Sequence, residues 1–94
     1  MSLNIQTVRC DALFASTVQS SDRPSARLVR DAISATVRRL GRRGCAAAVA
    51  QEFGDHPETA VARMRWVRDQ VARLATAEPV VAQRIEPTRL RLAA

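Results

Sequence analysis

Apolar residues recur every three or four positions along two long stretches of the chain. The first stretch, residues 24–40, places on one face Ala26, Val29, Ile33, Val37 and Leu40. The second, residues 57–76, places on one face Ala60, Met64, Val67, Val71 and Leu74. This spacing matches the 3.6-residue period of an α-helix with one buried face. The pattern therefore predicts two amphipathic helices that form the main pair of a helical bundle.

Capping residues set the expected limits of the first long helix. Ser21 or Asp22 can accept amide hydrogen bonds at its start, and Pro24 suits the first turn, where an amide proton has no partner. Gly41 follows the last apolar position, where a glycine in the left-handed conformation commonly ends a helix. We therefore expect a helix from Pro24 to Leu40.

The segment after Gly41 predicts a short helix over residues 45–53 and then a reversal of the chain. Gly54 ends this helix, Asp55 caps the next one, and Pro57 occupies its first turn. Glu58 can complete a capping box with Asp55. The short helix is expected to bridge the two long ones.

Both ends of the chain lack a clear period. Residues 1–10 are predicted as an extended arm, and a short helix is expected from Asp11 to about Gln19. Residues 79–94 contain Pro87 and are predicted as an irregular tail that is disordered or adds to a partner as an extended segment. The prediction is an all-α bundle of three or four helices, with one domain over residues 1–78.

Length and charge narrow the classes of protein. The chain has 94 residues, 15 of them arginine and none lysine, and a formal net charge of +6. One small domain of this size excludes a multi-domain enzyme. No run of roughly 18 apolar residues and no signal-peptide pattern is present, so a cytoplasmic protein without a membrane span is expected. In that reducing compartment Cys10 and Cys45 are expected as free thiols.

Few residues are suited to catalysis or metal binding. His56 is the single histidine, no tyrosine or lysine is present, and neither cysteine is spaced to pair with His56. A metal site assembled from Cys45, Glu52, Asp55 and His56 fits the usual ligand spacings poorly. No glycine-rich phosphate loop occurs. We therefore predict no enzyme activity, no cofactor, no metal and no small-molecule substrate.

A cluster of four arginines marks the region around Gly41. Its members are Arg38, Arg39, Arg42 and Arg43. Such a cluster can neutralise phosphates of a nucleic acid. Cations near the end of a helix also complement its dipole, and arginine is the sole basic residue type, so the cluster has a structural explanation as well.

Residues 45–66 resemble a helix-turn-helix motif. Ala50 and Gly54 have the A-x-x-x-G spacing of that family, and Thr59 to Arg63 resembles the T-V-x-R opening of its recognition helix. The resemblance implies that the second helix enters the major groove of DNA, while Arg42 and Arg43 contact phosphates. The residues implied to face DNA are His56, Glu58, Thr59, Ala62 and Arg63.

This segment also departs from the helix-turn-helix pattern. Asp55 follows the turn glycine where the family has an apolar residue, and Arg63 occupies another apolar site. Glu58 would repel phosphate at a groove-facing position. A helical hairpin that packs its own core explains the same residues without DNA.

The second long helix also carries a candidate dimer interface. A thin, alanine-rich core leaves large side chains that a second copy of the chain could cover. These are Met64, Trp66, Val67, Val71 and Leu74. Trp66 lies off the main stripe, so it either packs under the N-terminal part of its own chain or anchors a protein interface.

The chain is rich in arginine and alanine and contains two notable segments, RCDALFAS and RRGCAAAVAQEFGDHPETAVARMRWVR. Over residues 8 to about 74 the chain is similar to a group of small uncharacterised proteins from Streptomyces-type actinobacteria. That resemblance implies no activity and no functional residues. The prediction is a small non-enzymatic interaction or regulatory protein that forms a homodimer. The alternative is a helix-turn-helix-like DNA-binding transcriptional regulator.

Overall fold

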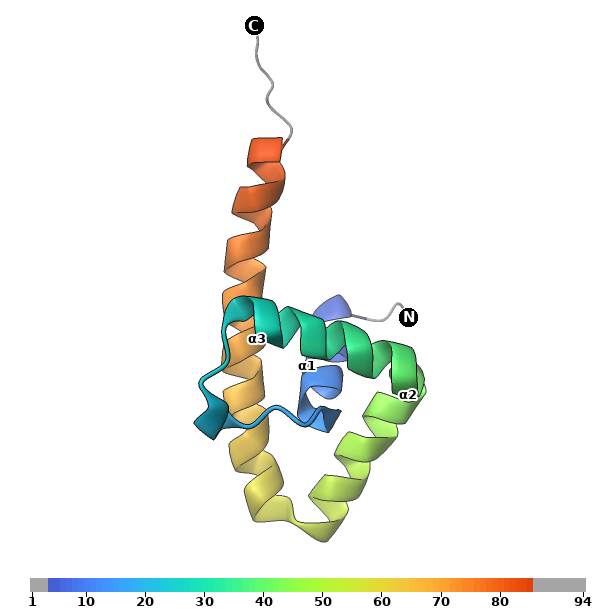
Figure 1. The fold of residues 1–94 in the computed structure, drawn as a ribbon. Coiled ribbons are helices and arrows are strands. Elements are labelled where there is room, and N and C mark those ends of the chain that lie inside the picture. Colours follow the sequence, from blue (N-terminus) through green and yellow to red (C-terminus); the bar gives the residue numbers. More distant parts are fainter. Residues whose placement is uncertain (1–3, 86–94) are drawn as a thin grey trace, which may run out of the picture.

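The computed structural model describes residues 4–85, with side chains through Thr76, and within that range it contains helices and no strand. Three α-helices and one 3₁₀ turn make up the fold (Figure 1). The predicted all-α bundle is confirmed. None of these helices is both long and apolar enough to cross a membrane.

Helix α1 spans Ile5–Ala15 and begins earlier than expected. Asn4 is its N-cap, and the Asn4 side chain accepts a hydrogen bond of 2.8 Å from the amide of Gln6. The extended arm predicted for residues 1–10 is therefore wrong from Ile5 onward, and residues 1–3 lie outside the described part. Asp11 lies inside the helix and does not cap it. The asparagine cap at position 4 outweighed the irregular apolar spacing.

A 3₁₀ turn, η1, over Ser20–Asp22 connects α1 to the next helix. Asp22 closes this turn by accepting a 2.8 Å hydrogen bond from the Gln19 amide. The cap of the next helix is Ser25, whose hydroxyl accepts from the Leu28 amide at 3.1 Å. The start predicted at Ser21 to Pro24 is thus displaced, because the serine directly before the helix supplies the capping oxygen.

Helix α2 spans Ala26–Asp55 and bends sharply at Gly41, which has φ 72° and ψ 169°. The positive φ agrees with the predicted helix end, although the ψ value is extended and not that of a left-handed cap. This combination of angles is open almost exclusively to glycine. The bend divides α2 into a first half over residues 26–40 and a second half over residues 42–55.

Helix α3 spans Pro57–Ile85, and His56 alone separates it from α2. The predicted reversal is confirmed, as is Pro57 in the first turn. Gly54 and Asp55 are helical, so the predicted stop at Gly54 and cap at Asp55 are wrong by one to two residues. The tail predicted from residue 79 is also wrong as far as Ile85, because α3 continues through Pro79. Residues 86–94 lie outside the described part.

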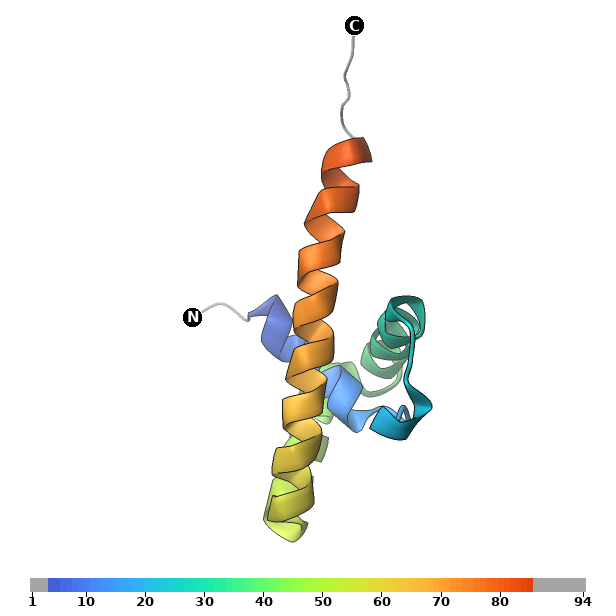
Figure 2. The ribbon, with the colours of Figure 1, turned by 90° about the vertical axis from the view of Figure 1, so that its left-hand side faces the viewer.

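Helix α1 occupies the centre of the fold. The two halves of α2 and the lower part of α3 outline a triangle in Figure 1, and α1 runs across it. In Figure 2, α1 crosses behind α3, and α3 continues well past the other helices. The expected arrangement, with the two long helices as the main pair, is therefore wrong. Ala12, Leu13 and Phe14 are at most 4% exposed, which makes α1 the element that both other helices cover.

The core confirms most of the predicted helix faces. In α3 the residues Ala60, Val67, Val71 and Leu74 are at most 2% exposed, while Met64 is half-buried. In α2, Val29 and Ile33 are buried, and Val37 and Leu40 pack against the core from its edge. Fully burying one such aliphatic side chain contributes about 1.5–3 kcal/mol. The 3.6-residue period therefore identified the buried stripe of both long helices, except that Ala26, at the start of α2, is exposed.

Candidate functional site

Arg63 connects α3 to the carboxyl end of α1. Its Nε donates to the carbonyl oxygen of Phe14 at 3.0 Å. One Nη donates to the carbonyl oxygens of Leu13, at 3.2 Å, and of Ser16, at 3.1 Å. The last carbonyls of a helix have no partner within the helix. Arg63 thus supplies donors to one end of α1, and its positive charge lies at the negative end of the helix dipole.

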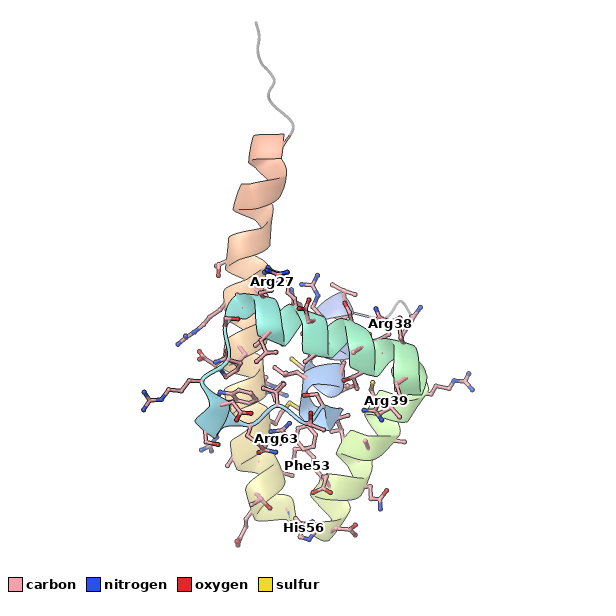
Figure 3. The ribbon with its side chains drawn as sticks, in the orientation of Figure 1. Arg27, Arg38, Arg39, Phe53, His56 and Arg63 are labelled. Atoms are coloured by element: carbon pink, nitrogen blue, oxygen red, sulfur yellow. The ribbon has the colours of Figure 1, made fainter. Side chains whose placement is uncertain are left out.

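Aromatic rings enclose the same guanidinium group. Its central carbon lies 5.6 Å from the centre of the Phe14 ring and 5.7 Å from that of Trp66. Phe14 in turn stacks on Phe53 of α2 with ring centres 5.9 Å apart, so residues of all three helices meet here. Figure 3 shows Arg63 pointing toward Phe53 inside the triangle. Burial lowers the pKa of Arg63, an effect that nearby Glu52 opposes.

The position of Arg63 bears on its predicted contact with DNA. Two of its three nitrogens donate to backbone oxygens of its own chain, so the side chain is directed into the fold. Trp66, three residues further along α3, is half-buried and packs against the core. Its two predicted roles, packing under the N-terminal part of its own chain and anchoring a protein interface, both stay predictions. No local sequence signal relates Arg63 to these carbonyl groups, which lie 47 to 50 residues away in the chain.

The turn between α2 and α3 carries negative charge. His56 Nδ1 lies 3.3 Å from the Glu52 carboxylate, and both side chains are exposed. Thr59 donates its hydroxyl to the His56 carbonyl oxygen at 3.2 Å. Asp55 and Glu58 are also exposed at this turn. His56 and Thr59, predicted to face DNA, are therefore accompanied by three carboxylates, which repel phosphate.

The arginine cluster lies at the opposite end of the second half of α2. Its four members flank the bend at Gly41 and are exposed, and Figure 3 shows Arg38 and Arg39 at this corner, far from His56. Within the described part of the chain, Arg38 and Arg42 form no ion pair. The fold thus separates the residues predicted to contact phosphates from those predicted to read bases.

An open groove of about 470 Å³ runs between α1 and the first half of α2. We call it the α1–α2 groove. Apolar side chains and arginines line it together with one serine, and the lining residues are Ile5, Val8, Arg9, Ile33, Ser34, Val37, Arg38 and Arg42. The sequence prediction missed this groove because residues 1–10 were not expected to be helical.

A second open groove of about 540 Å³ separates α1 from α3. We call it the α1–α3 groove. Small or apolar residues predominate in its wall, which is lined by Gln6, Thr7, Cys10, Asp11, Met64, Arg68, Val71, Ala72 and Ala75. Of the predicted interface residues, Met64 and Val71 therefore border a groove. Val71, like Val67 and Leu74, is nevertheless at most 2% exposed and is covered by the chain itself.

The chain matches no protein-family model, curated protein or solved structure.

The two cysteines are poorly suited to reactivity or metal binding. Burial raises the pKa of the Cys10 thiol and that of the Cys45 thiol above their ordinary value of 9.0. Nearby Asp11 raises both further, while Arg68 lowers that of Cys10 and Arg39 that of Cys45. A thiol that stays protonated at neutral pH is a weak nucleophile and metal ligand. Among the described residues, no group of three or more histidine, cysteine or acidic side chains could hold a metal ion.

Proposed function

We propose that this chain is a small non-enzymatic interaction protein that binds an acidic segment of a partner protein through α2. The observation that carries the proposal is the row of exposed arginines along α2. Arg27 and Arg30 belong to the first half, and Arg38 and Arg42 flank the bend. Within the described residues the latter two have no counter-charge in their own chain. A surface of one sign of charge attracts partners of the opposite sign and speeds their association.

DNA binding is the alternative function, and the same arginines favour it. The geometry supports it less well. A recognition helix reads bases with residues at its amino end, and at that end of α3 three carboxylates surround His56 and Thr59. Arg63 donates its hydrogen bonds to α1. We therefore favour a protein partner.

A binding experiment on α2 and α3 variants tests this proposal. We expect a fluorescein-labelled, unstructured glutamate-rich peptide to bind at low salt, with affinity falling at least about tenfold between 50 and 300 mM salt. Arg38→Glu combined with Arg42→Glu should abolish binding. Arg65→Glu combined with Arg73→Glu makes the same change of charge on α3. This control variant should keep most of the peptide binding.

Fluorescence anisotropy measures this binding, with a DNA duplex as the competing ligand. An equal loss of peptide affinity in the two double variants would mean that net charge alone governs binding. That result would overturn the assignment of the binding site to α2. Tight duplex binding that is lost on Thr59→Ala, but not in the α2 variant, would favour the DNA-binding alternative.

We further propose that two copies of the chain associate through the α1–α3 groove. Half-buried Met64 supplies apolar surface there, and the small side chains of Ala72 and Ala75 allow a second helix to approach closely. Light scattering on the purified protein should give about twice the 10.3 kDa mass of one chain. Ala72→Arg should give a monomer, while the same change at exposed Ala47 should not. A monomeric mass for the unaltered protein at high micromolar concentration would contradict this proposal.

A further inference from the structure

Apolar residues of both helices line the α1–α2 groove. Ile5 and Val8 are three residues apart on α1, and Ile33 and Val37 are four apart on α2, so each pair lies on one side of its helix. Ile5 is 59% exposed and is the most exposed of the large apolar side chains described. Two helices that leave an apolar channel between them form the kind of surface on which an amphipathic helix docks with its own apolar stripe.

The charged side chains that line the groove indicate which kind of partner it can bind. Arg38 and Arg42 both line the groove although the chain bends at Gly41 between them. Neither is paired with another described residue, and each can donate two parallel hydrogen bonds to a carboxylate. Arg39 and Arg43 are exposed on the same helix but do not line the groove. The groove therefore distinguishes two arginines of the cluster from the other two.

We propose that the α1–α2 groove binds an acidic amphipathic helix of another protein, with its apolar side chains against Ile5 and Val37 and its carboxylates on Arg38 and Arg42. The proposal rests on the function given above and specifies the form of the partner. Apolar side chains anchor the helix and exclude water, and the flanking ion pairs set its orientation. A nucleic-acid backbone would leave the exposed Ile5 side chain without an apolar partner.

Two labelled peptides of identical composition provide the test. One, of about 18 residues or about five turns, carries leucines every three or four positions and glutamates beside them, and the other is its scrambled form. We expect the amphipathic peptide to bind at least about tenfold more tightly. Binding is measured by fluorescence anisotropy with the full chain.

Matched variants assign this binding to the groove. Ile5→Asp and Arg38→Glu should each weaken the amphipathic peptide about tenfold or more. Leu28→Asp and Arg39→Glu, which make the same changes outside the groove, should change its affinity less than about threefold. Ile5→Asp places an acidic residue in the first turn of α1, where the helix dipole favours it, so the variant is expected to fold. Circular dichroism melting verifies that it does.

The outcomes separate this inference from the broader function. Equal affinity for the two peptides, or equal losses from Arg38→Glu and Arg39→Glu, would overturn the groove assignment while leaving an acidic partner on α2. Failure of both peptides to bind at 50 mM salt would overturn the proposed function as well. Preferential binding of the amphipathic peptide that survives Ile5→Asp would place its site elsewhere and also contradict the inference.

Discussion

Arg63→Ala is expected to lower the free energy of unfolding by about 3 kcal/mol, a large part of the roughly 5–14 kcal/mol typical of a domain this size. The substitution removes three hydrogen bonds from a charged donor to the end of α1. It also removes the guanidinium group from between Phe14 and Trp66. The carbonyl oxygen of Phe14 loses this donor in a partly buried place, where losing a partner costs more than the bond itself contributed, whereas that of Leu13 still accepts from Ser16. Urea unfolding followed by circular dichroism measures the loss.

Arg65→Ala is the matched control for Arg63→Ala. Arg65 is exposed on the same helix two residues away, and its removal should change the stability by no more than about 0.5 kcal/mol. Arg63→Lys should recover only part of the loss, because a compact ammonium group does not reproduce the planar fork of donors. Equal stability of the Arg63→Ala and Arg65→Ala variants would show that the junction contributes little. Because Arg63→Ala is expected to destabilise the fold, any effect of this variant on DNA binding must be corrected for its unfolded fraction.

Gly41→Ala is expected to destabilise the chain by about 2 kcal/mol through the backbone alone. A Cβ added at this position would meet no atom within 4 Å, so crowding contributes nothing. The cost arises because φ 72° with ψ 169° is a conformation that residues with a side chain avoid. Asparagine tolerates the left-handed region but not this ψ value, so Gly41→Asn should be destabilising too. Thermal unfolding measures both variants.

Gly54→Ala, in contrast, is expected to stabilise the chain against unfolding. Gly54 is helical and a Cβ there would also meet no atom within 4 Å. Alanine is favoured over glycine in a helix, so this variant should gain about 0.5–1 kcal/mol. If both glycine variants moved the melting temperature in the same direction, the bend at Gly41 would not be the constraint that shapes α2.

The bend also links the fold to the proposed binding groove. Arg38 and Arg42 lie on either side of the bend and both line the groove, so a change of the backbone angles at Gly41 would move one of them relative to the other. Loss of acidic-peptide binding in the Gly41→Ala variant, beyond what its unfolded fraction explains, is therefore consistent with the groove as the binding site.

Some elements were predictable because their signals are local. The apolar period of residues 57–76 identified the buried face of α3, since that face is a property of helix geometry. Gly41 and Pro57 marked a bend and a helix start, since their backbone preferences hold in any context. Cap positions were less certain, because several polar residues competed for each of them. Asn4 and Ser25 prevailed over Asp11 and Asp22.

The candidate sites depended on packing between distant segments. The α1–α2 groove needs Ile5 and Val37 side by side, and no pattern in the sequence relates these two positions. Sequence alone did not distinguish the four clustered arginines, whereas in the structure Arg38 and Arg42 line the groove and Arg39 and Arg43 do not. The helix-turn-helix resemblance grouped Arg63 with His56 and Thr59, whereas the fold directs Arg63 toward α1.

The sequence by itself determined an all-helical chain, the buried stripe of α3 and the breaks near Gly41 and His56, since periodicity and backbone preference act over a few residues. Only the tertiary structure decided that α1 lies at the centre and that Arg63 supplies donors to its carboxyl end. The partners there are 47 to 50 residues apart in the chain. Such contacts form when complementary surfaces meet in three dimensions, and local sequence preferences do not encode that meeting.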